Sequence, residues 1–323
     1  MSFLSKLGLA VAALASLVLP ASAQDYPNHT VRIIVPFAAG GPADVYSRQI
    51  AQYLSQALKQ PFVVEDQPGA GSIIGTNYVA HAPADGYTLL AMSNTHTVNE
   101  TLVPNRPFVL MRDFVPVAPI NYSDLVMVVN PSVPAKTLRD FIALAKAQPG
   151  KLNYASSGTG TPYHMAGELF KSMSGTDIQH VPYRGSSGAR NDVLGGQVQM
   201  MFDAITTMAP NVKAGQVRAL ATTGARRSIV LPDVPTVAEA GVPGYEATIW
   251  IGIMAPKGTP QAIVDKLNTA ITKATDHAEV RKMWAEQGAV PMTMTPAEFG
   301  AYLDKDIAKW ANVVKTANIH VDQ

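Results

Sequence analysis

The sequence predicts an α/β fold divided into two lobes. Apolar strands alternate with amphipathic helices along most of the chain, which is typical of α/β folds with mostly parallel sheets. Residues Val31–Gln60 and Leu152–Ser174 repeat one local design: an apolar strand, a loop of small residues and then a helix. Because the two copies lie far apart in the sequence, we expect one copy in each lobe.

Each of these loops leads into the N-terminus of a helix that could bind an anion. In loops Pro36–Asp44 and Ser156–Pro162, a capping residue, Gly41 or Thr161, precedes a proline at the first helical position. A helix start presents unpaired N–H groups and the positive end of the helix dipole, and small residues let an anion approach them. We therefore expect the two lobes to grip one anionic molecule. A tight turn without a ligand is the alternative at each loop.

The elements of the first lobe follow from short apolar runs and from helical spacing of apolar residues. The helix that begins at Pro42 places on one face Tyr46, Ile50, Tyr53, Leu54 and Ala57. The other elements expected here are the strands Val31–Phe37, Phe62–Glu65 and Thr88–Ser93 and the helix Ser72–Ala82.

The second lobe continues the alternation of strands and helices. Its expected strands are Leu125–Asn130, Leu152–Ala155, Ile178–Tyr183, Gln199–Asp203 and Val217–Thr222. Its expected helices are Leu138–Ala147, Tyr163–Met173, Ala189–Leu194 and Thr206–Val212.

The last part of the chain is expected to return to the first lobe. Residues Ala225–Tyr245 are rich in proline and glycine, which predicts surface loops with one short helix, Val237–Ala240. Strand Ala247–Met254 is the return crossing, and two helices, Pro260–Thr275 and Pro296–Thr316, finish the chain. The first lobe is then discontinuous, and its two crossings form a hinge near residues 120–125 and 247–251.

The N-terminus predicts export to a bacterial periplasm. Lys6, the apolar run Leu7–Leu19 and the small residues Ala21-Ser22-Ala23 form a signal peptide, cleaved before Gln24. The run is shorter than the ~20 apolar residues of a membrane span. The chain has no cysteine, which excludes a disulfide scaffold and a lipoprotein anchor.

Charge and histidine spacing exclude several kinds of partner. Without Lys6 the chain has 24 basic and 24 acidic residues, and its one basic run is Arg226-Arg227, so we expect neither nucleic acid nor anionic membranes as partners. The histidines show no ligand spacing, so no metal is expected. The run Gly69–Gly75 departs from the dinucleotide fingerprint and is interpreted as a third helix start facing the cleft; no cofactor is expected.

Three side chains leave alternatives open. Asp203 ends an apolar strand and is either a helix cap or a cleft residue. Arg184 either pairs with a ligand carboxylate or is solvated at the rim, and Trp250 belongs to the hinge, the core or a cleft wall.

Motifs along the whole mature chain resemble a known family. They are Ile34–Asp44 (IVPFAAGGPAD), Pro68–Gly71, Asp85–Leu89, Tyr154–Gly158, His164–Phe170, Val181–Gly185, Phe202-Asp203, Arg218–Ala221, Asp233–Thr236 and Ala255–Pro260. In this order the chain resembles the periplasmic solute-binding proteins of tripartite tricarboxylate transporters, the Bug family. One departure is Met165, where the family commonly has leucine.

The resemblance implies a two-lobed, type II periplasmic-binding-protein (flytrap) fold, each lobe a mixed sheet flanked by helices, joined by two crossing strands. Such a protein closes on a small carboxylate and delivers it to two integral-membrane subunits. The loops matching Phe37–Gly41 and Ser156–Thr161 would hold the carboxylate through backbone amides and water. The family motifs do not fix which acid is bound.

The sequence therefore predicts a monomeric, non-enzymatic binding protein for a carboxylate, with a dicarboxylate favoured. The predicted division is residues 1–23 (signal peptide), 24–122 plus 248–323 (first domain) and 123–247 (second domain). Two alternatives are a sensing lobe for a membrane signalling partner and a serine hydrolase using Ser157, His164 and Asp203, although the sequence has no G-x-S-x-G elbow. The predicted ligand-binding residues are Phe37, Ala39, Gly40, Gly41, Ser72, Ser93, Asn94, Ser156, Ser157, Gly158, Thr161, His164, Tyr183, Gly185 and Asp203.

Overall fold

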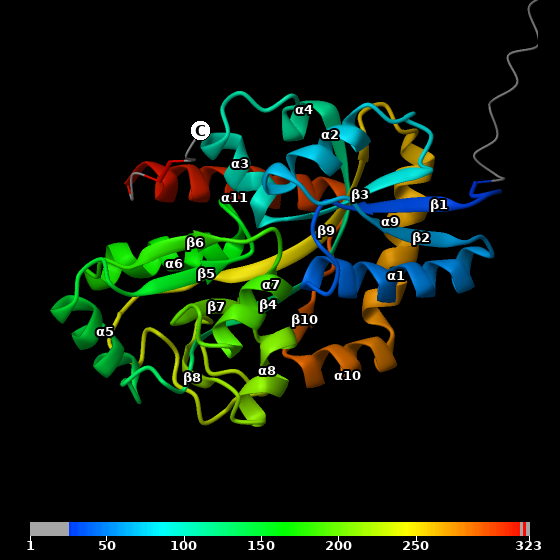
Figure 1. Cartoon of the computed structure of the whole chain (residues 1–323). Coiled ribbons are helices and arrows are strands. Elements are labelled where there is room, and N and C mark those ends of the chain that lie inside the picture. Colours follow the sequence, from blue (N-terminus) through cyan, green and yellow to red (C-terminus); the bar gives the residue numbers. More distant parts are fainter. Residues whose placement is uncertain (1–25, 317–318, 321–323) are drawn as a thin grey trace, which may run out of the picture.

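Two lobes, each built on a mixed sheet, share one long strand (Figure 1). The structure, a computed structural model, describes residues 26–316 and 319–320. The predicted signal peptide lies outside these residues. Among the helices of the described part of the chain, none combines the length and the apolar character needed to cross a membrane.

The sheet of the first lobe has the strand order β2-β1-β3-β9-β4. Its strands are β1 (Val31–Val35), β2 (Phe62–Asp66), β3 (Thr88–Ser93), β9 (Thr248–Pro256) and β4 (Phe114–Val129). β1 runs parallel to β2 and β3, whereas β9 is antiparallel to both β3 and β4. A short strand, β10 (Ala289–Pro291), pairs with the middle of β4.

The sheet of the second lobe takes over the far end of β4. β4 pairs with β9 up to Asp124, and from Leu125 it pairs with β7 (Met200–Ala204). β8 (Arg218–Thr222) also pairs with this end of β4. β5 (Asn153–Ser156) then pairs in parallel with β7 and with β6 (Gln179–Pro182). β4 therefore passes from one sheet to the other at residues 124–125, and a hinge near residues 120–125 stays a prediction.

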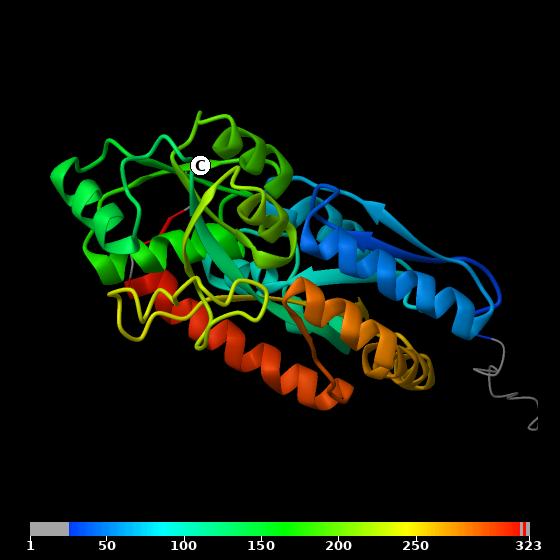
Figure 2. The ribbon, with the colours of Figure 1, turned by 90° about the horizontal axis from the view of Figure 1, so that it is seen from below.

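Helices cover these sheets (Figures 1 and 2). Those of the first lobe are α1 (Pro42–Leu58), α2 (Ile73–Ala80), α3 (Asn94–Leu102), α4 (Leu110–Asp113), α9 (Gln261–Asp276), α10 (Ala278–Gln287) and α11 (Pro296–Thr316). Those of the second lobe are α5 (Leu138–Ala147), α6 (Pro162–Ser174), α7 (Ser186–Leu194) and α8 (Ile205–Lys213). The last turns of α11 also reach the second lobe, because Trp310 and Val314 pack in one cluster with Met165 of α6.

The core follows the apolar patterns of the sequence. In α1 the side chains of Tyr46, Ile50 and Leu54 are buried as predicted, but Ala57, in the last turn of the helix, is exposed. Trp250 of β9 packs in the core of the first lobe against Phe299 of α11.

Several elements differ from the prediction. The helices α3, α4 and α10 and the strand β10 were not expected, and β4 begins 11 residues before the predicted Leu125. The predicted helix Val237–Ala240 is wrong: this segment forms hydrogen-bonded turns, in which Ala240 N–H donates to the Thr236 carbonyl. Its neighbours explain this, because Pro235 and Gly241 leave too few residues for a helix to propagate.

Candidate functional site

A cavity lies between the two lobes where the starts of α1 and α6 face each other. Its volume is about 30 Å³, which is enough for only a small group. The cavity is lined by Phe37, Ala38, Gly41, Pro42, Ala43, Ser93 and Thr95 of the first lobe, by Ser157, Thr161, Pro162, Tyr163, Gly185 and Ser186 of the second lobe, and by Ile249 and Ile251 of β9.

A larger pocket of about 680 Å³ adjoins this cavity, and the two share Phe37, Ser157 and Thr161. Its walls include the loop Pro68–Ser72 of the first lobe and Pro182–Arg184 of the second. The lobes touch at the rim, where the Ser187 hydroxyl donates to the Ala39 carbonyl at 3.2 Å. The molecule is therefore in a closed form.

Both helix starts that face the cavity lack a side-chain cap. Gly41 precedes α1 and Thr161 precedes α6, and neither residue makes a side-chain hydrogen bond to its helix. Because each helix has proline in its first turn, these ends present backbone N–H groups and dipole charge without a competing side-chain acceptor at the cap. This geometry fits the binding of an anion between the lobes.

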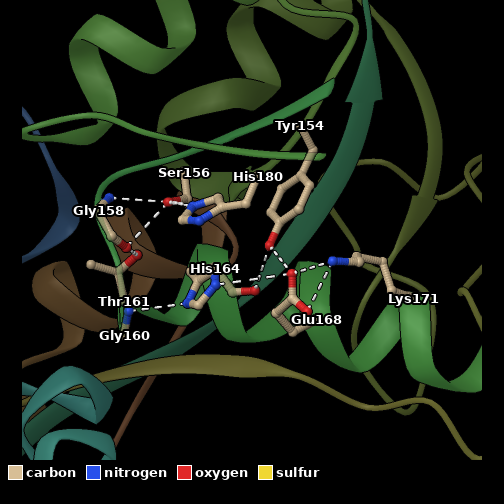
Figure 3. Close-up of polar contacts among 9 residues, drawn as sticks. All are labelled: Tyr154, Ser156, Gly158, Gly160, Thr161, His164, Glu168, Lys171 and His180. Carbon is tan, nitrogen blue, oxygen red and sulfur yellow. Dashed lines mark hydrogen bonds and ion pairs between the residues drawn. The ribbon is translucent and has the colours of Figure 1, made fainter. Parts of the chain in front are cut away.

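Not every amide in these loops is available to a ligand. Gly40 N–H donates to Asp44 Oδ2 at 2.8 Å. In the second loop, Gly158 N–H donates to Ser156 Oγ and Gly160 N–H donates to His164 Nδ1, each at 3.1 Å (Figure 3). Thr161 N–H donates to the Gly158 carbonyl at 3.3 Å. The prediction that backbone amides hold the carboxylate therefore concerns the remaining amides of these loops, such as those of Gly41 and Ser157, two residues that line the cavity.

Behind the second loop lies a buried polar network that contains His164 and His180 (Figure 3). The two imidazole rings stack with their centroids 4.1 Å apart, and His180 Nε2 lies 2.6 Å from Ser156 Oγ. Burial lowers the pKa of His164 to about 4 and that of His180 to about 3. Both rings are therefore neutral at pH 7.

The remaining part of this network neutralises one carboxylate. Glu168 accepts a hydrogen bond from the Tyr154 hydroxyl at 2.6 Å and pairs with Lys171 Nζ at 2.8 Å. Its carboxylate lies 4.0 Å from His164 Nε2. The network thus holds one acid, one base and two neutral rings directly beneath the second loop.

Two buried polar groups lie close to the cavity. Tyr163 lines the cavity, but its hydroxyl is fully buried, with Ser186 and the Asp203–Arg190 pair as its polar neighbours. Burial, with the nearby Asp203 carboxylate, raises the pKa of Tyr163, so the hydroxyl keeps its proton. Nearby, Arg190 Nε pairs with Asp203 Oδ2 at 2.7 Å, while Arg190 Nη2 is buried without a partner in the described part of the chain.

The predicted ligand-binding residues fall into two groups. Those that line the cavity or the adjoining pocket are Phe37, Gly41, Ser72, Ser93, Ser157, Gly158, Thr161, Tyr183 and Gly185. Those that line neither are Ala39, Gly40, Asn94, Ser156, His164 and Asp203. Ligand contact by any of these residues stays a prediction.

The residues of the second group have partners of their own. Ala39 and Gly40 lie at the lobe contact with Ser187. Asn94 bridges α3 and β9, since its Oδ1 accepts from Trp250 N–H at 3.0 Å. Asp203 is fully buried and pairs with Arg190. It does not cap helix α8, whose N-cap residue is Ala204, and it does not line the cavity.

The hydrolase alternative gains no support from these positions. His164 is bonded through Nδ1 to Gly160 and faces Glu168 through Nε2, whereas Asp203 pairs with Arg190. A nucleophile, a base and an orienting acid must share one hydrogen-bonded chain, and these three residues do not.

Sequence reasoning missed part of the cavity wall, namely Thr95, Tyr163, Ser186, Ile249 and Ile251. Tyr163 directly follows the proline that marks the start of α6, and Thr95 follows Ser93, which caps α3. The N-cap pattern of Ser93 was therefore the signal that could have placed Thr95 at a helix start.

Comparisons with known proteins agree with this geometry. Residues 46–319 match the family model described as the tripartite tricarboxylate transporter family receptor. An R. palustris protein solved with adipate is 36% identical, with a TM-score of 0.89 over 92% of this chain and 99% of that one. The periplasmic binding protein BugD is 32% identical, with a TM-score of 0.87 over 91% and 99%. MatC from Rhodopseudomonas palustris, solved with bound malate, is 33% identical, with a TM-score of 0.85 over 90% and 100%.

Proposed function

The chain belongs to the tripartite tricarboxylate transporter receptor family, and from that premise we propose that it captures a small dicarboxylate between its lobes. It then delivers this ligand to the two integral-membrane subunits of a tripartite transporter. The protein acts as a monomer in the periplasm and performs no chemistry on its ligand.

The observation that carries this proposal is the pair of uncapped helix starts, one from each lobe, that line one cavity. A carboxylate there accepts N–H bonds from both lobes, so the ligand itself links the lobes. Each charge-assisted hydrogen bond contributes ~1.5–3 kcal/mol and each helix end roughly 0.3–1 kcal/mol more. Four or five such contacts supply the ~8 kcal/mol of micromolar binding after the cost of immobilising the ligand.

The rest of the ligand extends into the larger pocket, which shares Phe37, Ser157 and Thr161 with the cavity. The cavity of about 30 Å³ holds one carboxylate, and the pocket of about 680 Å³ has room for the second. The adipate and malate in the structures of two relatives support the same ligand class.

A thermal-shift screen tests this function. The panel contains dicarboxylates of different chain length, monocarboxylates, citrate and amino acids. A ligand at ~100 times its dissociation constant adds ~2.7 kcal/mol to the free energy of unfolding, which raises the melting temperature by several degrees. Stabilisation by citrate or by amino acids alone would reject the dicarboxylate, and hydrolysis of generic esters would reject the non-enzymatic role.

Export is tested separately, because the predicted signal peptide lies outside the described residues. We expect intact-mass measurement of periplasmic protein to show an N-terminus at Gln24. A mass that retains residues 1–23 would contradict this.

A further inference from the structure

We propose that His164 is a positioning residue, whose ring holds the Ser156–Thr161 loop in the shape that closes on the ligand. This inference rests on the proposed function, because it concerns the same cleft. His164 lies in the first turn of α6, directly after the loop, and the residue is 4% exposed. Its Nδ1 lies 3.1 Å from Gly160 N (Figure 3).

This contact fixes the protonation of the ring. A backbone N–H can only donate, so Nδ1 must be the acceptor and must carry no proton. The neutral ring therefore carries its proton on Nε2, which faces Glu168 Oε1 at 4.0 Å. A doubly protonated ring would place N–H against N–H, and the contact with Gly160 would be lost.

The surroundings of the ring keep it neutral. The titratable groups that face it are His180 of β6, stacked on it, Tyr154 of β5, and Glu168 and Lys171 of its own helix. The Glu168 carboxylate is already paired with Lys171 and accepts a hydrogen bond from Tyr154. Its negative charge is therefore largely balanced and does little to stabilise a protonated His164. Burial is the main reason that the pKa of His164 falls to about 4, and Lys171 adds to it.

Gly160 is the point at which the loop meets the other lobe. Its φ of +78° is a conformation that favours glycine, and a β-carbon there would lie 3.0 Å from both Asn99 Oδ1 and Leu102 Cδ2 of α3. Asn99 in turn donates to the Gly71 carbonyl at 2.9 Å, in the wall of the larger pocket. Gly160 therefore lies against α3 of the other lobe, and a change in its backbone orientation would alter this contact between the lobes.

Two substitutions separate the hydrogen bond from the packing of the ring. His164→Asn places an amide oxygen where Nδ1 was, so it keeps an acceptor that does not titrate. His164→Phe keeps the ring and its stacking on His180 but removes the acceptor. His81→Asn is the matched control, because His81 is exposed at the end of α2 in the first lobe.

The readout is the dissociation constant for adipate, measured by calorimetry at pH 7. We expect His164→Phe to weaken binding at least tenfold and His164→Asn to stay within about threefold of wild type. Equal binding by wild type and His164→Phe, or an equal loss of affinity in His164→Phe and His164→Asn, would overturn the proposal.

A measurement without ligand keeps this test independent of the proposed function. Nitrogen-15 spectra of the imidazole should show an unprotonated Nδ1 at pH 7, and Gly160 amide exchange should be slow in wild type and His164→Asn but fast in His164→Phe. If adipate does not bind to wild type, the adipate assignment fails and these spectra alone decide the role of His164. A protonated Nδ1, or equal Gly160 exchange in all variants, would reject it.

Discussion

Gly185 and Ala38 face each other across the cleft, and a β-carbon added to Gly185 would lie 2.6 Å from the Ala38 β-carbon. Such a distance is too short for two carbons in contact. The backbone of Gly185 is extended, with a φ of 171°, so any residue fits there locally. Glycine is therefore required at this position by the closeness of the two lobes.

Substitution Gly185→Ala should prevent full closure without harming either lobe. We expect adipate affinity to fall at least tenfold, while the melting temperature without ligand changes by less than about 2 °C. Small-angle scattering at saturating ligand should give a larger radius of gyration than for wild type. The control is Gly188→Ala in α7, whose β-carbon meets only an ordinary contact with Tyr183 at 3.4 Å. Equal loss of affinity in both variants would argue against closure as the cause.

Substitution Arg184→Ala tests whether the carboxylate depends on an arginine. Arg184 lines the larger pocket but not the closed cavity, so we expect affinity to fall by less than tenfold, as for a charge at a solvated rim. Titration calorimetry in low and moderate salt measures this effect. Abolished binding would show that the guanidinium, and not the helix starts, holds the ligand.

Substitution Asp203→Asn should reduce stability, because Arg190 would remain buried without an anionic partner. The Asp203 carboxylate is fully buried and accepts from Arg190 Nε and from Ala204 N–H. Breaking a buried ion pair costs about 3–5 kcal/mol, and the slight exposure of Arg190 places this case near the lower end. Urea unfolding measures the loss. An unchanged free energy of unfolding with an altered ligand profile would instead support Asp203 as the cleft residue considered from the sequence.

Stability should fall as the pH drops below 6.5, because three buried histidines resist protonation. Burial lowers the pKa of His96 and His164 to about 4 and that of His180 to about 3. Between pH 6.5 and these values the unfolded chain takes up protons that the folded chain does not, so the free energy of unfolding decreases and then levels off. Urea unfolding between pH 8 and 4 should show a loss of several kcal/mol in total. The exposed His29 serves as control, since His29→Asn should leave this curve unchanged.

Substitution Asp124→Asn should stabilise the protein above pH 6. Asp124 lies where β4 changes partner, and burial, with the nearby Glu246, raises its pKa to about 6. The unfolded carboxyl ionises already near pH 4, so the cost to the folded state grows between pH 4 and 6 and is fully present above pH 6. We expect a gain of about 1–2 kcal/mol at pH 8 and almost none at pH 4. A gain that is equal at both pH values would point to a cause other than ionisation.

The prediction of the fold succeeded where local patterns and tertiary structure agree. Strand β3 and helix α5 have the predicted bounds, since β3 is a buried apolar run and α5 has a capping box of Thr137 and Asp140. The first part of β4 was missed because Pro116 and Pro119 argue against a central strand. The structure accommodates them with irregular register at both prolines, so that the ladder with β9 continues past them.

The sequence was enough to predict which loops form the site, but not which individual contacts those loops make. The cap-and-proline pattern located both helix starts at the cavity. Which amides are already bonded depends on the side chains of Asp44, Ser156 and His164, and the pairing of Arg190 with Asp203 joins a helix to a strand. Such pairings arise from tertiary packing, which no local sequence pattern records.

The position of β9 has a consequence for the order in which the chain acquires its structure. β9 lies between β3 and β4 in the first sheet, although it follows the whole second lobe in sequence. The second sheet can assemble from residues that end at β8, whereas β3 keeps an unpaired edge until residue 256 arrives. An exposed apolar edge strand is prone to aggregation. A chain that emerges from its N-terminus can therefore complete its second sheet first, while one edge of β3 stays unpaired.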